Sequence, residues 1–223
     1  VSWTSHDCVG YLRKVTRIKK IGHTGTLDPF ATGLLLVAIG REATSRISEY
    51  TGLSKTYRAT IMLGATSDTQ DSTGVITYTA GEKKASQITV AEIKNVLKQF
   101  CGEQQQIPPM YSAKRFQGAK LYELAREGKV VERKPKKITV FRLQLCDEYI
   151  IQLDQDTIQI DIEAHVSTGT YIRTLAHDIG EALGVGGYCD SLIRTHIGPF
   201  HLFDAQPLET ITPEIIQQNI FHV

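Results

Sequence analysis

Several common signatures of metal and nucleotide sites are missing from this chain of 223 residues. The four cysteines are widely separated, so no Cys-x-x-Cys pair exists on which a zinc site could be built. The seven histidines include no His-Glu-x-x-His spacing. A P-loop and the glycine pattern of dinucleotide-binding folds are also absent. The sequence therefore gives no support for a metal site or a nucleotide cofactor.

The chain also lacks a long apolar run. No stretch of about 18 apolar residues occurs, so we expect no membrane-spanning helix. Scattered cysteines are typical of buried thiols in a reducing compartment, which predicts a cytoplasmic protein. We also expect the protein to be a monomer. Apolar residues make up 41% of the chain and charged residues 22%, so a folded core is expected rather than wholesale disorder.

A strong net charge is missing too, because the formal charge is only +1. Its distribution is more informative, since contacts with nucleic-acid phosphates are local. The first basic cluster comes directly before a glycine-rich loop and consists of Arg13, Lys14, Arg17, Lys19 and Lys20. Two further clusters consist of Lys129, Arg133, Lys134, Lys136 and Lys137, and of Lys114, Arg115 and Lys120. Each could simply be a solvated face, but the first adjoins the candidate catalytic loop described below.

The apolar pattern predicts a mixture of helices and strands. Helices are expected over 5–17, 42–50, 89–100, 120–126 and within 169–184, with Ser5 capping the first and Thr89 the third. Strands are expected over 33–39, 57–63, 75–79, 107–113, 138–145, 158–166 and 191–195. The strands 138–145 and 158–166 are the clearest and should form a hairpin. Because strands and helices do not alternate regularly, the mixture indicates an α+β fold with a largely antiparallel sheet.

The most informative segment is 22–35, with the sequence GHTGTLDPFATGLL. Its glycines permit tight turns, and Pro29 biases Asp28 away from the helical region. The segment is predicted to be a shaped loop that holds one carboxylate before the apolar run 34–39. Such a carboxylate is a candidate nucleophile or base, although Asp-Pro pairs are also common in ordinary turns. From the loop alone, the ordinary turn is the favoured interpretation.

This segment resembles the catalytic motif of the TruB-type tRNA pseudouridine-55 synthases, which isomerise a uridine in the T-arm loop of tRNA. Similar segments follow in the family's order, at 55–59 (KTYRA), 64–74 (GATSDTQDSTG), 106–114 (QIPPMYSAK), 167–175 (STGTYIRTL) and 192–200 (LIRTHIGPF). The resemblance covers roughly 5–208. It implies the pseudouridine synthase fold, which is α+β with a mixed, largely antiparallel central sheet flanked by helices and loops.

The resemblance also predicts the domain organisation. We expect a catalytic domain over 1–208 and a C-terminal tail over 209–223. A family strand with a Lys-Pro segment, usual upstream of this region, is not in the sequence. The C-terminal RNA-binding domain of PUA type that many members carry is not in it either. The missing C-terminal domain bears on the expected affinity for tRNA more than on the chemistry.

The resemblance implies roles for particular residues. Asp28 would be the catalytic carboxylate, which either adds covalently or promotes loss of the C2′ proton. Arg173 would pair with Asp28 and keep it ionised, and Tyr57 would stack on the uracil and exchange a proton with it. His23 would lie beside the flipped base, and Leu192 would form an apolar wall. Without the resemblance, these residue types also fit a surface salt bridge, core positions and a structural histidine.

The reaction sets the remaining expectations. The N1–C1′ bond breaks and the uracil is rejoined through C5 without redox change or group transfer, so no cofactor is needed. The target uridine is stacked in a folded loop and must be extruded by the enzyme. The expected partner is the T-arm stem-loop of tRNA, and further substrate-binding residues are predicted to be Arg17, Lys19, Lys20, Lys114 and Arg194.

Two alternatives remain open from the sequence. One is an RNA-guided synthase of the dyskerin type that acts on ribosomal RNA. Residues 30–33 and the short C-terminus are more similar to the stand-alone enzymes. The other is a non-catalytic RNA-binding module on the same scaffold. A pure RNA binder has no need of a carboxylate at Asp28, because that charge would repel phosphates.

Overall fold

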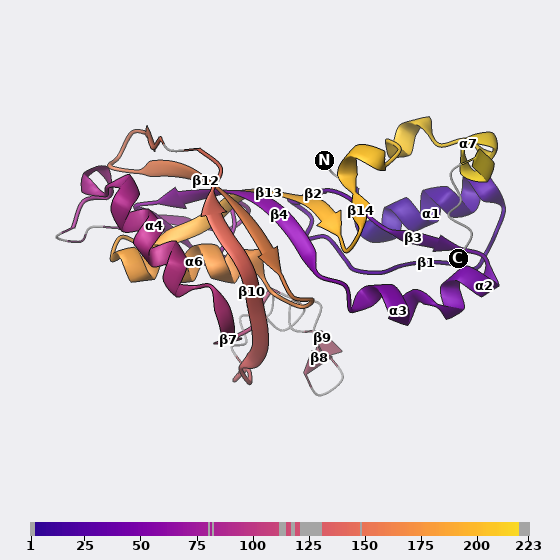
Figure 1. The fold of residues 1–223 in the computed structure, drawn as a ribbon, viewed down its shortest axis with the longest axis horizontal. Coiled ribbons are helices and arrows are strands. Elements are labelled where there is room, and N and C mark those ends of the chain that lie inside the picture. Colours follow the sequence, from indigo (N-terminus) through magenta and orange to yellow (C-terminus); the bar gives the residue numbers. More distant parts are fainter. Residues whose placement is uncertain are drawn as a thin grey trace. The chain divides into compact units, whose positions relative to one another are not determined.

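The computed structural model describes residues 3–79, 81, 83–111, 115–116, 119–120, 131–147 and 149–218 (Figure 1). The chain divides into two compact units, and each is described by itself. The first unit consists of Val1–Tyr57 and Ile193–Val223, and the second of Arg58–Leu192. The division of the sequence at residue 208 into a catalytic domain and a tail stays a prediction.

Short elements build the first unit. Its helices are α1 (Ser5–Thr16), α2 (Arg41–Ser45), α3 (Ile47–Thr51) and α7 (Pro213–Gln218), with 3-10 turns η2 (Leu202–Asp204) and η3 (Leu208–Thr210). Its strands are β1 (Ile21–His23), β2 (Thr32–Gly33), β3 (Val37–Ile39) and β14 (Phe200–His201). β1 and β3 pair antiparallel, with His23 opposite Val37. The predicted strand over 33–39 is therefore wrong in its middle, since residues 34–36 belong to no strand.

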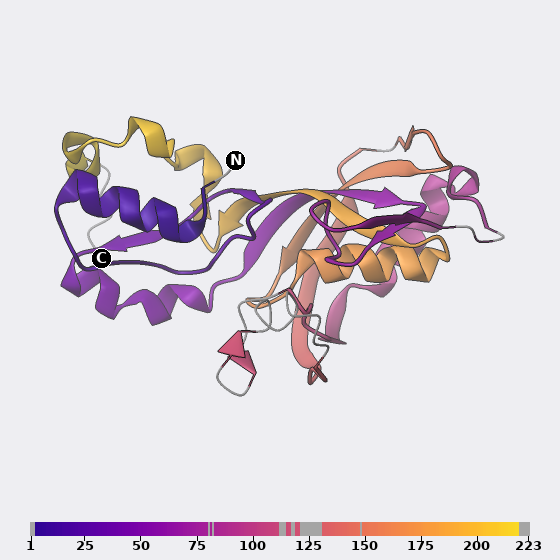
Figure 2. The same ribbon diagram turned by 180° about the vertical axis from the view of Figure 1, so that it is seen from behind.

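The apolar face of α1 forms the core of the first unit. Val9, Leu12 and Ile21 are buried together, and the partly buried side chains packed against them are Val37, Ile39, Leu208, Ile211 and Ile216. Figure 2 shows the C-terminal segment lying along α1. Residues after 208 thus contribute apolar contacts to this core.

The predicted helix over 42–50 is interrupted, and α2 and α3 meet at Arg46. The hydroxyls of Thr44 and Ser45 donate hydrogen bonds to the carbonyls of Gly40 and Glu42, at 2.7 and 2.6 Å. Such side-chain bonds compete with regular helix bonding and bend or end short helices.

The second unit contains most of a larger mixed sheet. The strands of that sheet are β4 (Lys55–Leu63), β7 (Gly102–Gln106), β10 (Lys136–Leu145), β11 (Ile151–Gln152), β12 (Ile158–Val166) and β13 (Gly187–Ile197). Their order is β14-β13-β4-β12-β10-β7, with β11 on β12 and β2 on β13. Since β10 pairs antiparallel with both β12 and β7 while β2 pairs parallel with β13, the sheet is mixed and the α+β prediction is confirmed. The predicted hairpin of 138–145 with 158–166 is also confirmed.

Helices cover this sheet in the second unit. The helices are α4 (Val90–Gln99), α6 (Ile172–Leu183) and the 3-10 turn η1 (Ala85–Gln87). Two small strand pairs are also present. One joins β5 (Ala65–Ser67) to β6 (Ile76–Tyr78), and the other joins β8 (Arg115–Phe116) to β9 (Ala119–Lys120). α4 contacts both α6 and β10. At Gly180 a Cβ would lie 2.2 Å from the nitrogen of Gly187, so only glycine lets α6 pack this closely on the start of β13.

Two predictions around residues 107–126 fare differently. The strand expected over 107–113 is wrong as far as it is described, because β7 ends at Gln106 and residues 107–111 form no strand. Pro108 and Pro109 have no N–H to donate to a sheet ladder. The helix expected over 120–126 lies outside the described residues, apart from Lys120 in β9.

Candidate active site

The loop that carries Asp28 connects β1 to β2 in the first unit and is held by backbone contacts. The Ala31 N–H donates to the Asp28 carbonyl at 2.9 Å, which closes a turn around Pro29. The Leu27 N–H donates to Oγ of the buried residue Ser5, in the first turn of α1, at 3.0 Å. The predicted shaped loop is therefore present, and α1 fixes it one residue before Asp28.

Arg194 of β13 binds this loop on both sides of Asp28. Its side chain is only 1% exposed, and its Nε donates to the Leu34 carbonyl at 2.8 Å. Its Nη2 donates to the Gly25 carbonyl at 3.2 Å. The sequence predicted that Arg194 binds substrate, and this burial among backbone carbonyls gives that prediction no support.

Tyr57, at the start of β4, lies within the electrostatic range of both Arg194 and Asp28. Burial raises the pKa of the Tyr57 phenol, and the charge of Asp28 raises that pKa as well. The charge of Arg194 and a hydrogen bond from the Arg194 guanidinium lower the pKa. Burial has the largest effect, so the phenol is neutral at pH 7. The structure thus brings the predicted residues Asp28 and Tyr57 together with Arg194.

His23 ends β1 on the approach to the same loop. Burial lowers the pKa of its imidazole, and the positive charges of Arg194 and His6 lower it further. Its Nδ1 is buried and has no hydrogen-bond partner among the described residues, and the same holds for Oγ1 of Thr24. An unsatisfied buried polar atom costs about 1–3 kcal/mol, so this position favours a ligand that supplies the missing bond.

Arg173 of α6 lies in the second unit and is 3% exposed. Its Nη1 is 3.1 Å from Oδ2 of the buried Asp71, and its Nη2 donates to the Tyr111 carbonyl at 2.9 Å. From the sequence, Asp71 was placed in a polar loop without a role. Its ion pair with Arg173 was not predicted. The pairing of Arg173 with Asp28 stays a prediction.

The other predicted substrate contacts differ in exposure. Leu192 is buried in β13, which suits a pocket wall and a core position equally. Arg17, Lys19 and Lys20 are exposed, as phosphate contacts must be. Arg13 donates from Nε to the Lys19 carbonyl at 3.2 Å, which orders the backbone of this basic stretch. Lys114 lies outside the described residues.

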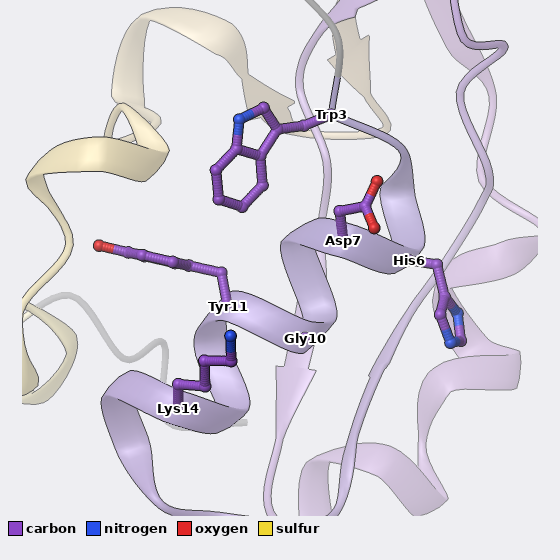
Figure 3. Close-up of a pocket in the computed structure, with 6 residues that line it drawn as sticks. All are labelled: Trp3, His6, Asp7, Gly10, Tyr11 and Lys14. Atoms are coloured by element: carbon purple, nitrogen blue, oxygen red, sulfur yellow. The ribbon is translucent and has the colours of Figure 1, made fainter.

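A shallow cavity of about 480 Å³ lies on α1, apart from the predicted site residues. Figure 3 shows its lining residues, which are Trp3, His6, Asp7, Gly10, Tyr11 and Lys14. The rings of Trp3 and Tyr11 meet edge to face, with centroids 5.5 Å apart. Among the described residues, no group of His, Cys, Asp and Glu side chains could hold a metal ion, and no helix is long and apolar enough to cross a membrane.

Comparison with known families and curated proteins agrees with the motifs. The model of the TruB family pseudouridylate synthase N-terminal domain matches residues 13–172, and that of the tRNA pseudouridylate synthase B C-terminal domain matches residues 173–219. The tRNA pseudouridine synthase B of Geobacillus thermodenitrificans is 44% identical over 232 aligned residues, which cover 99% of this chain and 75% of that protein. That of Syntrophomonas wolfei is 46% identical over 209 residues, covering 93% and 67%.

Solved structures agree on the fold. A Cbf5–Nop10–Gar1 complex matches with a TM-score of 0.63 and 29% identity, over 90% of this chain and 47% of that chain. An H/ACA ribonucleoprotein bound to a substrate RNA containing 2′-deoxyuridine matches with a TM-score of 0.63 and 25% identity, over 99% and 53%. This chain spans about half the length of those chains. The expected pseudouridine synthase fold is confirmed, and the chain belongs to the TruB family of pseudouridine synthases, which are isomerases.

Proposed function

We propose that this chain converts the uridine at position 55 of tRNA, in the T-arm loop, to pseudouridine, with Asp28 as the catalytic carboxylate. The observation that carries the proposal is the placement of Asp28 on a loop pinned at Leu27 and beside Tyr57 and Arg194. The curated relatives are tRNA pseudouridine synthases by name, which supports a tRNA substrate. The choice of position rests on the resemblance of segment 22–35 to the family motif.

The reaction needs few protein groups. Cleavage of N1–C1′ frees the uracil, which turns and forms the C5–C1′ bond; C5 then loses its proton and N1 gains one. Asp28 either adds covalently or removes the C2′ proton, and a carboxylate in a fixed loop suits both routes. Tyr57 enters the reaction as a neutral phenol, so it can stack on the uracil and donate a hydrogen bond to it.

Substrate binding is assigned to residues close to this loop in the chain. The exposed Arg17, Lys19 and Lys20 would contact RNA phosphates just before β1. The neutral imidazole of His23, with its unpartnered Nδ1, supports a contact with the opened RNA loop. Such contacts offset the few kcal/mol that extrusion of a stacked uridine costs.

Arg173 completes the proposed catalytic set. The segment that carries it, 167–175, resembles the family segment with the active-site arginine. Its guanidinium is ordered within the second unit by Asp71 and by the carbonyls of Thr69 and Tyr111. A guanidinium held in this way keeps one orientation.

Release of the C5 proton provides the test. Transcripts of tRNA labelled with tritium at C5 of uridine should lose one label per molecule, and a transcript with cytidine at position 55 should lose none. A bare T-arm stem-loop without guide RNA should also react. Dependence on a guide RNA would instead favour the RNA-guided class, and binding without conversion would favour the non-catalytic module.

A further inference from the structure

We propose that Arg194 is a positioning residue, which holds the Asp28 loop and Tyr57 in their reactive arrangement without contacting the RNA. This inference rests on the proposed function. It replaces the sequence-based expectation that Arg194 binds substrate directly.

The guanidinium of Arg194 joins two distant points of the loop by hydrogen bonds. Its Nε and Nη2 bind the carbonyls of Leu34 and Gly25, which lie on either side of Asp28 in the chain. The loop therefore cannot open without breaking a buried, charge-assisted hydrogen bond. Such bonds contribute more to stability than neutral ones, because the donor carries a full charge.

The backbone of Arg194 fixes the same loop a second time. Arg194 pairs with Gly33 where β13 runs parallel to β2, and the Leu34 N–H donates to the Arg194 carbonyl at 2.8 Å. Gly33 has a φ of 105°, and a Cβ there would lie 2.4 Å from the Arg194 carbonyl oxygen. Only glycine permits this approach, so the position of the loop relative to the Arg194 side chain is set by the strand pairing.

Burial separates this role from phosphate binding. With 1% of its surface exposed, the Arg194 side chain is covered by protein. The planar guanidinium carries donors in a fixed fork, which reaches both carbonyls and the Tyr57 phenol together. A lysine at this position would keep the positive charge, but its single ammonium could not span the same acceptors.

Ser5 holds the segment between the two Arg194 contacts. Its buried Oγ accepts the Leu27 N–H, so the loop is tied at Gly25, Leu27 and Leu34. The sequence assigned Ser5 as the cap of α1, but that cap is Thr4, whose side chain accepts the Asp7 N–H. The Ser5 hydroxyl is therefore available to the catalytic loop.

Arg194→Lys tests the proposal, with three quantities measured separately. These are the single-turnover rate of pseudouridine formation in tRNA, the Kd for tRNA at several salt concentrations, and the melting temperature. We expect the rate to fall by about 100-fold, because small displacements of reacting groups have effects of that size. The Kd should stay within about twofold and its salt dependence unchanged, because no phosphate contact is lost.

Thr195→Val is the matched control. Thr195 is the next residue of β13, and its hydroxyl donates to the Thr56 carbonyl at 3.2 Å. This variant loses that bond and a second partly buried one, between the Thr195 hydroxyl and Nδ1 of His196 at 2.9 Å, but neither partner belongs to the Asp28 loop. It should lower the melting temperature while the rate measured below that temperature stays at the wild-type value.

Two outcomes with folded Arg194→Lys protein would overturn the proposal: a wild-type rate, or weaker binding with a reduced salt slope and an unchanged rate. If Arg194→Lys does not fold, Ser5→Ala tests the proposal instead. We expect its rate to fall by about tenfold while the Kd for tRNA stays unchanged. A wild-type rate in Ser5→Ala would contradict the proposal. Inactivity of the wild-type protein on tRNA would be a failure of the proposed function instead.

Discussion

Single residues of the Asp28 loop illustrate what a sequence can reveal about a site. Asp28 and Tyr57 were identified through family motifs, and the structure brings them together. The burial of Arg194 was missed, although a signal existed. In a strand, residues two apart face the same side, so Arg194 shares a face with Leu192 while Ile193 is 38% exposed. The hydrogen bond from Leu27 to Ser5 joins residues 22 positions apart, and no local pattern reveals it.

The lowered pKa of His23 predicts a pH dependence of stability. An imidazole whose pKa is lowered by folding binds a proton more readily in the unfolded chain. The contribution of neutral His23 to the free energy of unfolding is therefore complete above the unfolded pKa of about 6.5, and it is lost as the pH falls below that value. In His23→Gln the melting temperature should fall less between pH 7.5 and pH 5.5 than in the wild type. An equal drop in melting temperature in the two proteins over this pH range would contradict the lowered pKa of His23.

At the scale of elements, periodicity predicted most of the isolated helices and strands, but the segments 33–39, 42–50 and 107–113 differ from the structure. Helix α4 begins after Thr89, as expected, and a capping box with Glu92 explains why. The apolar run 34–39 was harder, because such a run fits a strand or another buried segment equally. The backbone groups of Leu34 bind Arg194 of β13, so a distant partner ends the strand at Gly33.

The cap of α4 gives a prediction at this scale. Thr89→Ala removes the hydroxyl that accepts the Glu92 N–H, and should lower the free energy of unfolding by about 1 kcal/mol. Urea denaturation checks this value, and the rate of pseudouridine formation should not change. Thr89→Ser keeps the hydroxyl and should retain most of the stability. Equal losses in the two variants would show that the methyl group, rather than the cap, stabilises the helix.

For the whole molecule, irregular alternation of helices and strands was enough to predict an α+β fold, but not its division into two units. The contribution of the C-terminal residues was also missed. Leu208, Ile211 and Ile216 pack on the α1 core, yet their partners Val9 and Leu12 lie about 200 positions away. Periodicity finds an apolar face within one element, whereas it cannot identify a partner that far along the chain.

The basic stretch gives a prediction for binding of the whole substrate. The double variant Lys19→Gln/Lys20→Gln should bind tRNA several-fold more weakly, and the slope of log Kd against log salt should fall by between about 1 and 2. Filter binding at several salt concentrations measures both quantities. Lys94→Gln/Lys98→Gln, in α4 of the second unit, removes the same charge and should leave the slope unchanged. An equal effect of both pairs would indicate general attraction instead of a defined contact.

Asp28→Asn tests the central claim most directly. The substitution keeps the size of the side chain, but an amide can neither add to C1′ nor accept the C2′ proton. Single-turnover measurement of pseudouridine formation in tRNA, with the Kd measured in parallel, should give no detectable product and a Kd within about twofold of the wild type. Asp147→Asn, which changes an exposed carboxylate, should react normally. Product formation by Asp28→Asn at the wild-type rate would contradict the account.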